Sequence, residues 1–176
     1  MNFLELAKLR TSCRSYQDRP VPSETLAYCL EAAQVAPSAC NQQPWRFVVV
    51  ETPELRAELS KNALLPGIPM PWVATAPVIV VLCAKKSLAV HHIAAMVSGV
   101  HYHLIDLGIA GEHLVLAAAE QGLGSCWIGW FRAKQVRKIL NLPRSLEPVS
   151  LITLGYPAGE AKTTERKPLS EIAEFQ

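Results

Sequence analysis

The stretch that decides the fold runs from residue 104 to residue 129 and reads Leu104-Ile-Asp-Leu-Gly-Ile-Ala-Gly-Glu-His-Leu-Val-Leu-Ala-Ala-Ala-Glu-Gln-Gly-Leu-Gly-Ser-Cys-Trp-Ile-Gly129. From Leu104 to Ala119 its composition predicts a helix with apolar residues on nearly every side. A helix that is apolar all round has to be buried on all sides. In a chain of this length we therefore expect a second subunit to cover part of it. The glycines of Gly122-Leu-Gly124 end the helix, and Cys126–Ile128 is predicted to be a short strand.

The composition supports a buried, layered protein. The 176 residues are 50% apolar and 18% charged, whereas about 25% charged is typical. This balance excludes a disordered chain, which needs low hydrophobicity and high charge. The longest apolar stretch, Val73–Ala84, has 12 residues, and a membrane span needs about 20. We therefore expect one domain over residues 1–176 with no membrane span, and we assign the apolar excess to a partner chain or a bound apolar cofactor.

Charge and cysteine content exclude further classes of protein. A net charge of +2 with a pI near 8.3 is too mild for a nucleic-acid-binding protein, whose pI usually lies above about 9. The five cysteines are irregularly spaced and contain no CxxC pair, which argues against a zinc site or a secreted disulfide framework. The N-terminus shows no apolar signal core. We therefore expect a reduced, cytoplasmic setting and no nucleic-acid partner.

The histidines and aspartates favour neither a metal centre nor a hydrolytic triad. All five histidines, which are His91, His92, His101, His103 and His113, fall in one stretch predicted to be helical. None are four residues apart, so we prefer interfacial or solvated histidines to the alternative of a metal site. Asp18 and Asp106 are the only aspartates, and a Ser-His-Asp triad would require Asp18 to reach that helix. We predict no metal ligand and no catalytic side chain.

Helices and strands alternate outward from the central stretch. Helices are predicted at residues 3–10, 24–35 with Ser23 as N-cap, 53–60, 88–121 and 133–140, and strands at residues 46–51, 78–83, 126–128 and 149–154. This alternation indicates an α/β or α+β layered domain around a small sheet. The tail after residue 155 has little periodicity, but its Leu169, Ile172 and Phe175 are apolar. We expect the tail to pack on another surface, such as a second subunit.

Three segments carry groups that suit a ligand. Arg10-Thr-Ser-Cys-Arg14 offers two guanidinium groups and two hydroxyls, which suits a phosphate, although a cationic helix end is the plainer alternative. Ala36–Trp45 is a proline-braced loop rich in amides, which suits the edge of a polar ring or, more simply, a loop that satisfies its own backbone. Gly122–Gly129 allows backbone to approach a flat ligand, or it only caps the helix.

The order of these segments resembles the nitroreductase family of FMN-dependent oxidoreductases. Arg10-Thr-Ser-Cys-Arg-Ser-Tyr16 is similar to the family pattern R-[RHT]-S-x-R-x-[FY], and Ala36-Pro-Ser-Ala-Cys-Asn-Gln-Gln-Pro-Trp45 is similar to A-P-S-x-N-x-Q-P-W. The central stretch is similar to D-x-G-x-A…L-A-A…G-L-G-S-x-W-I-G. Leu154-Gly-Tyr-Pro157 and Arg166-Lys-Pro-Leu169 match the closing segment. The resemblance extends over nearly the whole chain.

The resemblance implies a fold and a site. The fold is an α+β, three-layer α/β/α sandwich with a small central mixed sheet, a long central helix and a C-terminal tail that packs on the partner subunit. The assembly is a homodimer with FMN at its interface. By position, the residues implied to bind the cofactor are Arg10, Thr11, Ser12, Arg14, Pro37, Ser38, Ala39, Asn41, Gln43, Trp127, Ile128, Gly129 and Arg166. Of these, Arg10, Ser12, Arg14 and Arg166 would hold the phosphate and ribityl chain. One side of the isoalloxazine ring would be lined by Pro37, Ser38, Asn41 and Gln43, and the other would be approached by the backbone of Trp127, Ile128 and Gly129.

The resemblance also implies an activity. The family transfers hydride from NAD(P)H through the flavin N5 to a small acceptor, such as a nitroaromatic or a quinone, by a ping-pong mechanism. The flavin carries the chemistry while the protein supplies orientation and electrostatics. Two alternatives stay open: a flavin-binding dimer without reductase turnover, and a flavin enzyme of this fold with different chemistry, such as reductive dehalogenation or flavin fragmentation. The loop Leu64–Trp72 has no match to the flavin-edge residues of longer members, so the sequence does not define the acceptor.

Overall fold

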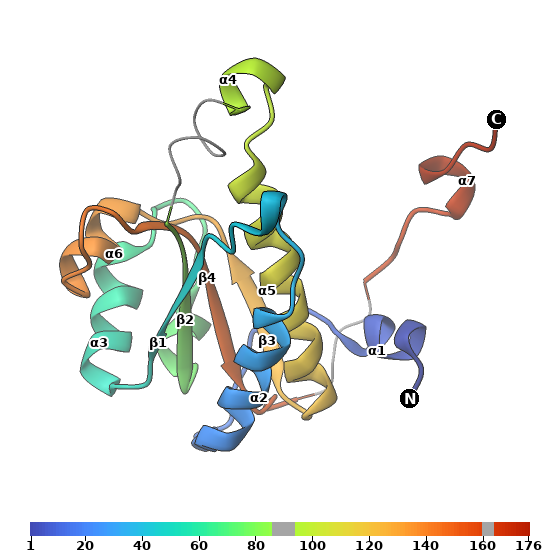
Figure 1. The fold of residues 1–176 in the computed structure, drawn as a ribbon. Helices are drawn as coiled ribbons and strands as arrows, with labels where there is room; N and C mark the ends of the chain where they lie inside the picture. Colours follow the sequence, from blue (N-terminus) through green and yellow to red (C-terminus); the bar gives the residue numbers. More distant parts are fainter. Residues whose placement is uncertain (86–93, 160–163) are drawn as a thin grey trace.

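The computed structural model of the chain describes residues 1–85, 94–159 and 164–176, and it shows a four-stranded sheet between two helical layers (Figure 1). The strand order is β1-β2-β4-β3. The strands are β1 (Trp45–Val50), β2 (Val78–Ala84), β3 (Gly124–Ile128) and β4 (Glu147–Gly155). The three-layer α+β architecture expected from the sequence is therefore confirmed.

Strand β2 lies at the centre because every one of its residues is apolar. All seven are buried. Val78 and Val80 pack into one core cluster, while Ile79 and Val81 pack into a second cluster on the other face. Successive side chains of a strand point to opposite faces. A strand apolar at every position is thus stable only where helices cover both faces of the sheet.

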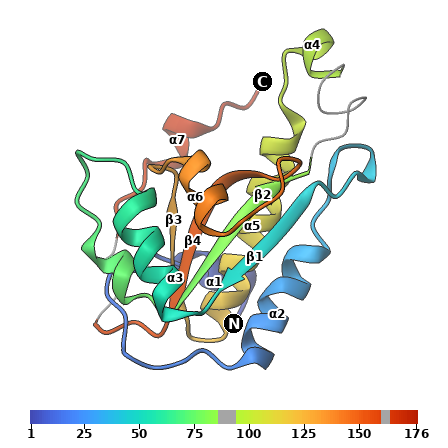
Figure 2. The same ribbon diagram turned by 90° about the vertical axis from the view of Figure 1, so that its left-hand side faces the viewer.

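The helices supply these two covers (Figures 1 and 2). On one face, α2 (Ser23–Gln34) and α5 (Tyr102–Glu120) pack side by side against the sheet. The opposite face is covered by α3 (Pro53–Glu58), the π-helical turn Leu59–Ala63, the short 3₁₀ helix Pro71–Thr75 and α6 (Ala133–Ile139). Arg56 links the chain on this side, because its guanidinium donates to the carbonyl of Ala76.

Two details of the sheet and of α2 differ from the expectation. All three strand pairs are antiparallel, so the sheet is not mixed among the described residues. Among the described residues, parallel pairing is limited to an isolated bridge between Ser12 and Ser125. The direction of a strand depends on how the connection before it crosses the sheet, which the residues of the strand do not reveal. Ser23 is the first helical residue of α2 rather than its N-cap. Pro22 takes the N-cap position, and its carbonyl accepts the amide of Leu26 at 3.1 Å.

The helix predicted over residues 88–121 is interrupted. Residues 88–93 lie outside the described residues, α4 covers Ala94–Ser98, and α5 begins only at Tyr102. Gly99 lies between them at φ +71°, a left-handed conformation that ends a helix and that glycine adopts without strain. Near its start, α5 leaves Leu104 and Ile105 about half exposed, whereas Leu107 and Leu114 are fully buried.

Both ends of the chain carry short helices with exposed apolar side chains. Helix α1 (Phe3–Leu9) exposes Phe3 and Leu4, and α7 (Leu169–Ile172) stands apart from the body of the protein (Figure 1). Among the described residues, 164–176 of the C-terminal tail belong to none of the core clusters, and Phe175 is 91% exposed. In the described parts of the chain, no helix has the length and apolar character that crossing a membrane requires.

Helix α5 lies close to strand β3 because of Gly111. A Cβ atom placed on Gly111 would lie 2.2 Å from Cη2 and 2.6 Å from Cζ2 of Trp127. We therefore predict that Gly111→Ala lowers the free energy of unfolding by about 1–3 kcal/mol, the usual cost of overpacking a core. Urea unfolding measures this change.

A second background makes this prediction specific. Trp127→Leu removes both ring atoms that meet the new methyl group, so Gly111→Ala should cost markedly less there. An equal cost in both backgrounds would show that the contact with Trp127 is not the reason for the glycine.

Candidate cofactor site

A pocket of about 560 Å³ lies where the segment after α1, the α5–β3 turn and the C-terminal tail meet. This volume is within the range of small-molecule sites. Arg10 and Arg14 contribute from one end of the chain, and Arg166 contributes from the other. The described lining residues are Leu9, Arg10, Thr11, Ser12, Cys13, Arg14, Ser15, Ala119, Gly122, Leu123, Gly124, Ser125, Pro157, Gly159, Thr164 and Arg166. They include three guanidinium groups and no carboxylate.

Backbone pairing holds the arginine segment in place. Helix α1 ends at Leu9, and Arg10 turns into extended backbone. Two residues later Ser12 pairs with Ser125 of β3, and the amide of Cys13 donates to the carbonyl of Ser125 at 2.8 Å. The segment therefore runs along the edge of the sheet, beside the backbone of the glycine-rich turn.

The buried hydroxyl of Tyr16 fixes the far end of this segment. It donates to the carbonyl of Cys13 at 3.0 Å and lies 2.7 Å from the hydroxyl oxygen of Thr153 on β4. Burial raises the pKa of Tyr16 far above its ordinary value. The phenol therefore stays neutral and serves as a structural hydrogen-bonding group.

The charge of the pocket suits an anion with several oxygens. Guanidinium groups bind phosphate through paired hydrogen bonds, and the hydroxyls of Thr11 and Ser12 lie beside them in the lining. Glu112 on α5 lies 3.7 Å from Nε of Arg10. This carboxylate restrains the Arg10 side chain, which is 17% exposed. The sequence-predicted phosphate residues are thus brought together in one place.

The amide-rich loop lies elsewhere, at the start of α5. The amide of Ala39 donates to the buried carboxylate of Asp106 at 3.0 Å. The amide of Gln43 donates to the hydroxyl of Ser38 at 2.9 Å. The Gln43 side chain donates to Oδ1 of Asn41 at 3.0 Å.

The backbone of this loop takes an unusual path. Cys40, Asn41 and Gln43 all have φ between +46° and +52°, the left-handed region that non-glycine residues seldom adopt. Strain of this kind persists only where surrounding contacts enforce it, and Asp106 and Ser38 provide them here. Asn41 and Gln43 are exposed, so the amide groups they do not use inside the loop face outward.

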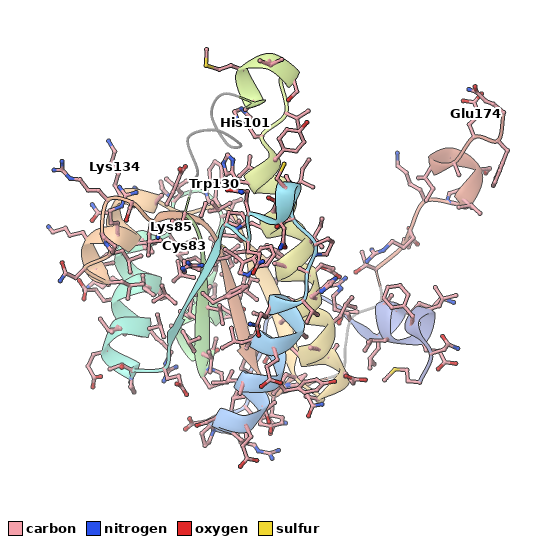
Figure 3. The ribbon with its side chains drawn as sticks, in the orientation of Figure 1. Cys83, Lys85, His101, Trp130, Lys134 and Glu174 are labelled. Carbon is pink, nitrogen blue, oxygen red and sulfur yellow. The ribbon has the colours of Figure 1, made fainter. Side chains whose placement is uncertain are left out.

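The third group of predicted residues lies at the end of β3. The side chain of Ile128 is buried in the core, and the ring of Trp127 packs near Gly111. The exposed residue of the group is Gly129, so backbone is what this segment offers to a ligand. Next to it, Nε1 of Trp130 donates to the carbonyl of Pro66 at 2.9 Å. Trp130 and His101 lie at the end of the molecule from which α4 projects, and Glu174 lies on the separated tail (Figure 3).

The predicted residues divide into two places within one chain. Arg10, Thr11, Ser12, Arg14 and Arg166 line the pocket. The remaining predicted residues lie outside its lining; they are Pro37, Ser38, Ala39, Asn41, Gln43, Trp127, Ile128 and Gly129. Asp106 holds the amide-rich loop near the start of α5, and Ala119 touches the pocket near its end. At 1.5 Å per residue these two positions are about 20 Å apart.

Sequence reasoning missed some residues of the site. Ser125 and Cys13 line the pocket but were not among the predicted site residues. The position of Ser125 inside the G-L-G-S segment is the sequence signal by which it could have been found. Asp106 also escaped notice as the residue that holds the loop, although its place in the D-x-G-x-A pattern pointed to it. Groups of His, Cys, Asp and Glu that suit a metal ion are absent from residues 1–85, 94–159 and 164–176. His91 and His92 lie outside these residues.

Fold and site together define a layered α+β protein with an arginine-lined anion pocket beside a glycine-rich turn. The Nitroreductase family model matches residues 7–68 and 62–156. The chain therefore belongs to the nitroreductase family.

Individual relatives agree with this assignment. A Methanothermobacter thermautotrophicus protein, provisionally named NADH dehydrogenase/NAD(P)H nitroreductase, is 35% identical over 169 residues, which cover 94% of this chain and 82% of that protein. The crystal structure of a nitroreductase family protein from Streptococcus pneumoniae TIGR4 has a TM-score of 0.86 at 31% identity, covering 99% of this chain and 100% of that chain. An FMN-dependent nitroreductase from Clostridium difficile R20291 has a TM-score of 0.78 at 29% identity, covering 93% and 92%.

Proposed function

We propose that this protein is an FMN-dependent NAD(P)H oxidoreductase that reduces a small acceptor such as a nitroaromatic or a quinone. The observation that carries the proposal is the pocket in which Arg10, Arg14 and Arg166 converge from opposite ends of the chain. The names of the relatives support the cofactor and the electron donor, since one is an NAD(P)H nitroreductase by name and one is FMN-dependent.

The residues present fit the phosphate end of FMN. Three guanidinium groups and the hydroxyls of Thr11 and Ser12 are among the donors, and no carboxylate lies among the described lining residues. Arg10, Ser12, Arg14 and Arg166 would hold the phosphate and the ribityl chain. Bound FMN would supply hydride transfer from NAD(P)H through its N5 to the acceptor, in two half-reactions.

The other two groups of residues would hold the ring. Ser38, Asn41 and Gln43 present hydroxyl and amide groups on a rigid loop, and such groups are suited to the polar edge of a flavin. Backbone at Gly129 would come close to a flat ring, since no side chain intervenes there. Donors placed at this edge would stabilise negative charge on the ring. No acid or base from the protein is needed, which agrees with the scarcity of aspartate.

We further propose that two copies of the chain build the site together. Within one chain Asp106 holds the amide-rich loop, whereas Ala119, which lines the anion pocket, lies about 20 Å further along α5. Leu104 and Ile105 on α5, and Phe175 on the tail, are apolar and exposed. A second copy that covers these side chains would also bring its loop toward the pocket.

The dimer is tested by sedimentation of the flavin-loaded protein. We expect a stable dimer of about twice 19.3 kDa, because a homodimer interface buries apolar surface of this kind. Deleting residues 167–176, which removes the exposed apolar tail but keeps Arg166, should weaken the dimer. A monomer that keeps its FMN would contradict the shared site.

Anaerobic reduction of the bound flavin tests the activity itself. The purified protein, loaded with FMN, is expected to lose its yellow absorbance on addition of NADH or NADPH and to regain it with a quinone or nitroaromatic. Flavin that binds but is not bleached by either nucleotide would favour the alternative of a flavin-binding dimer without turnover. A protein that binds no FMN would reject the proposal.

Arginine variants test the phosphate assignment. We predict that Arg10→Ala and Arg166→Ala each weaken FMN binding about ten- to a hundredfold, because a charge-assisted hydrogen bond contributes roughly 1.5–3 kcal/mol. Fluorescence titration of the apoprotein with FMN measures the dissociation constant. Arg19→Ala is the matched control, since the Arg19 guanidinium lies 3.7 Å from the Tyr156 ring and outside the pocket lining. Equal affinity in all three variants and the parent would refute the assignment.

A further inference from the structure

Two cysteines lie on neighbouring backbone segments beside the anion pocket, and the proposed reaction uses neither. Cys13 lines the pocket and is partly exposed, while Cys126 is buried in β3. All five cysteines of the chain are free thiols. The arrangement of these two thiols is what sets them apart from the other three.

The strand pairing places the two residues opposite each other. Ser12 pairs in parallel with Ser125, and the Cys13 amide donates to the Ser125 carbonyl at 2.8 Å. This bridge is isolated, and its register, continued by one residue, sets Cys13 opposite Cys126. Neighbouring strands lie about 4.8 Å apart, which is inside the Cα separation of about 4.4–6.8 Å that a disulfide spans.

The two side chains also lie on one face. Gly124 and Cys126 are two residues apart in β3, so their side-chain directions are the same. A Cβ atom on Gly124 would lie 2.6 Å from Cβ and 2.7 Å from Sγ of Cys13. The Cys13 side chain therefore occupies the space above Gly124, on the face to which Cys126 points.

The surroundings give the two thiols different roles. Burial raises the pKa of the Cys126 thiol, although the Arg14 guanidinium and a hydrogen bond with the Ser12 side chain oppose this rise. Cys13 reaches solvent through the pocket, so a soluble oxidant meets it first. Its Sγ donates to the carbonyl of Ser15 at 3.1 Å, a weak bond that is lost if the sulfur turns toward Cys126.

The remaining cysteines are poor partners. Cys29 and Cys83 are buried in the two main core clusters, and burial raises the pKa of each thiol to about 11. Cys40 is exposed, but it belongs to the amide-rich loop at the start of α5. It does not line the pocket.

We propose that Cys13 and Cys126 form an oxidative modification site, at which a hydroperoxide converts the pair into a disulfide. In the first step the Cys13 sulfur attacks the peroxide, the O–O bond breaks, and Cys13 becomes a sulfenic acid with release of one water or alcohol. In the second step the Cys126 sulfur attacks the Cys13 sulfur, and the hydroxyl leaves as water. The two thiols lose two electrons and two hydrogens, and the peroxide gains them.

The location couples this chemistry to the pocket. An anion held by Arg10 and Arg14 covers Cys13 and slows the first step. Conversely, the disulfide draws the Ser12–Arg14 segment toward β3 and takes the Cys126 thiol away from the Trp127 carbonyl, to which it donates at 3.6 Å. The oxidised protein should therefore bind FMN more weakly than the reduced protein.

The test uses the full chain with Cys40→Ser, which removes the exposed thiol and leaves four cysteines. Hydrogen peroxide is added to the reduced apoprotein, free thiols are counted after denaturation, and peptides are mapped without reduction. We expect the loss of two thiols and a linked peptide pair containing Cys13 and Cys126. Inorganic phosphate or FMN at saturating concentration should slow the loss.

Matched variants make the outcome decisive. In the Cys40→Ser background, Cys13→Ala and Cys126→Ala should each abolish the linked pair, while Cys29→Ala should leave it unchanged. Circular dichroism of each variant verifies that it is folded, and the peptide map of the parent stands even if one variant fails to fold. Oxidation of Cys13 that stops at sulfenic or sulfinic acid with Cys126 still free, or a disulfide that appears only between chains, would overturn the proposal.

This test is independent of the proposed oxidoreductase activity. A linked pair in a protein that binds no FMN would reject the proposed function and keep the modification site. Bound FMN that NAD(P)H reduces, without a linked Cys13–Cys126 peptide pair, would reject the modification site and keep the proposed function.

Discussion

The close contact of helix α5 with the sheet is the constraint on which the rest of the structure depends. It requires Gly111, because any side chain there would occupy the volume of the Trp127 ring. Once α5 lies at this distance, its start brings Asp106 to the amide-rich loop. Its middle brings Glu112 to Arg10, and its end forms part of the anion pocket. One helix thus sets the positions of two groups of candidate ligand-binding residues.

A second principle is the separation of apolar and charged regions. Strand β2 is buried along its whole length, and apolar side chains cover both of its faces, with the buried hydroxyls of Ser150 and Thr153 on the neighbouring strand β4. At the edges of this core, the guanidinium groups of Arg56 and Arg137 donate hydrogen bonds to backbone carbonyls. Arg10, Arg14 and Arg166 are therefore distinctive because they converge on one open pocket. An anion bound there would meet concentrated positive charge in a chain whose net charge is only +2.

Much of the fold was predictable because local patterns were strong. The all-apolar run Val78–Cys83 predicted a strand covered on both faces, and β2 is one. Predictions were weaker where a single residue decides a boundary. Pro22 took the N-cap position expected for Ser23, and Gly99 broke a helix that composition alone made continuous. Strand directions were not predictable, since helical connections of these lengths allow parallel and antiparallel neighbours alike.

The sequence by itself determined which residues are candidates for the site: the arginines and hydroxyls of Arg10–Arg14, the amides of Ser38–Gln43 and the glycine-bearing end of β3. Residue type is enough for this, because the capacity to bind phosphate or a polar ring edge belongs to the side chains. Only the tertiary structure decided how these groups are distributed. It joined Arg166 to Arg10 across the length of the chain, and it set the amide-rich loop at the far end of α5. It also placed Cys13 over the Gly124–Cys126 face, a juxtaposition that arises from strand register and is invisible in residue spacing.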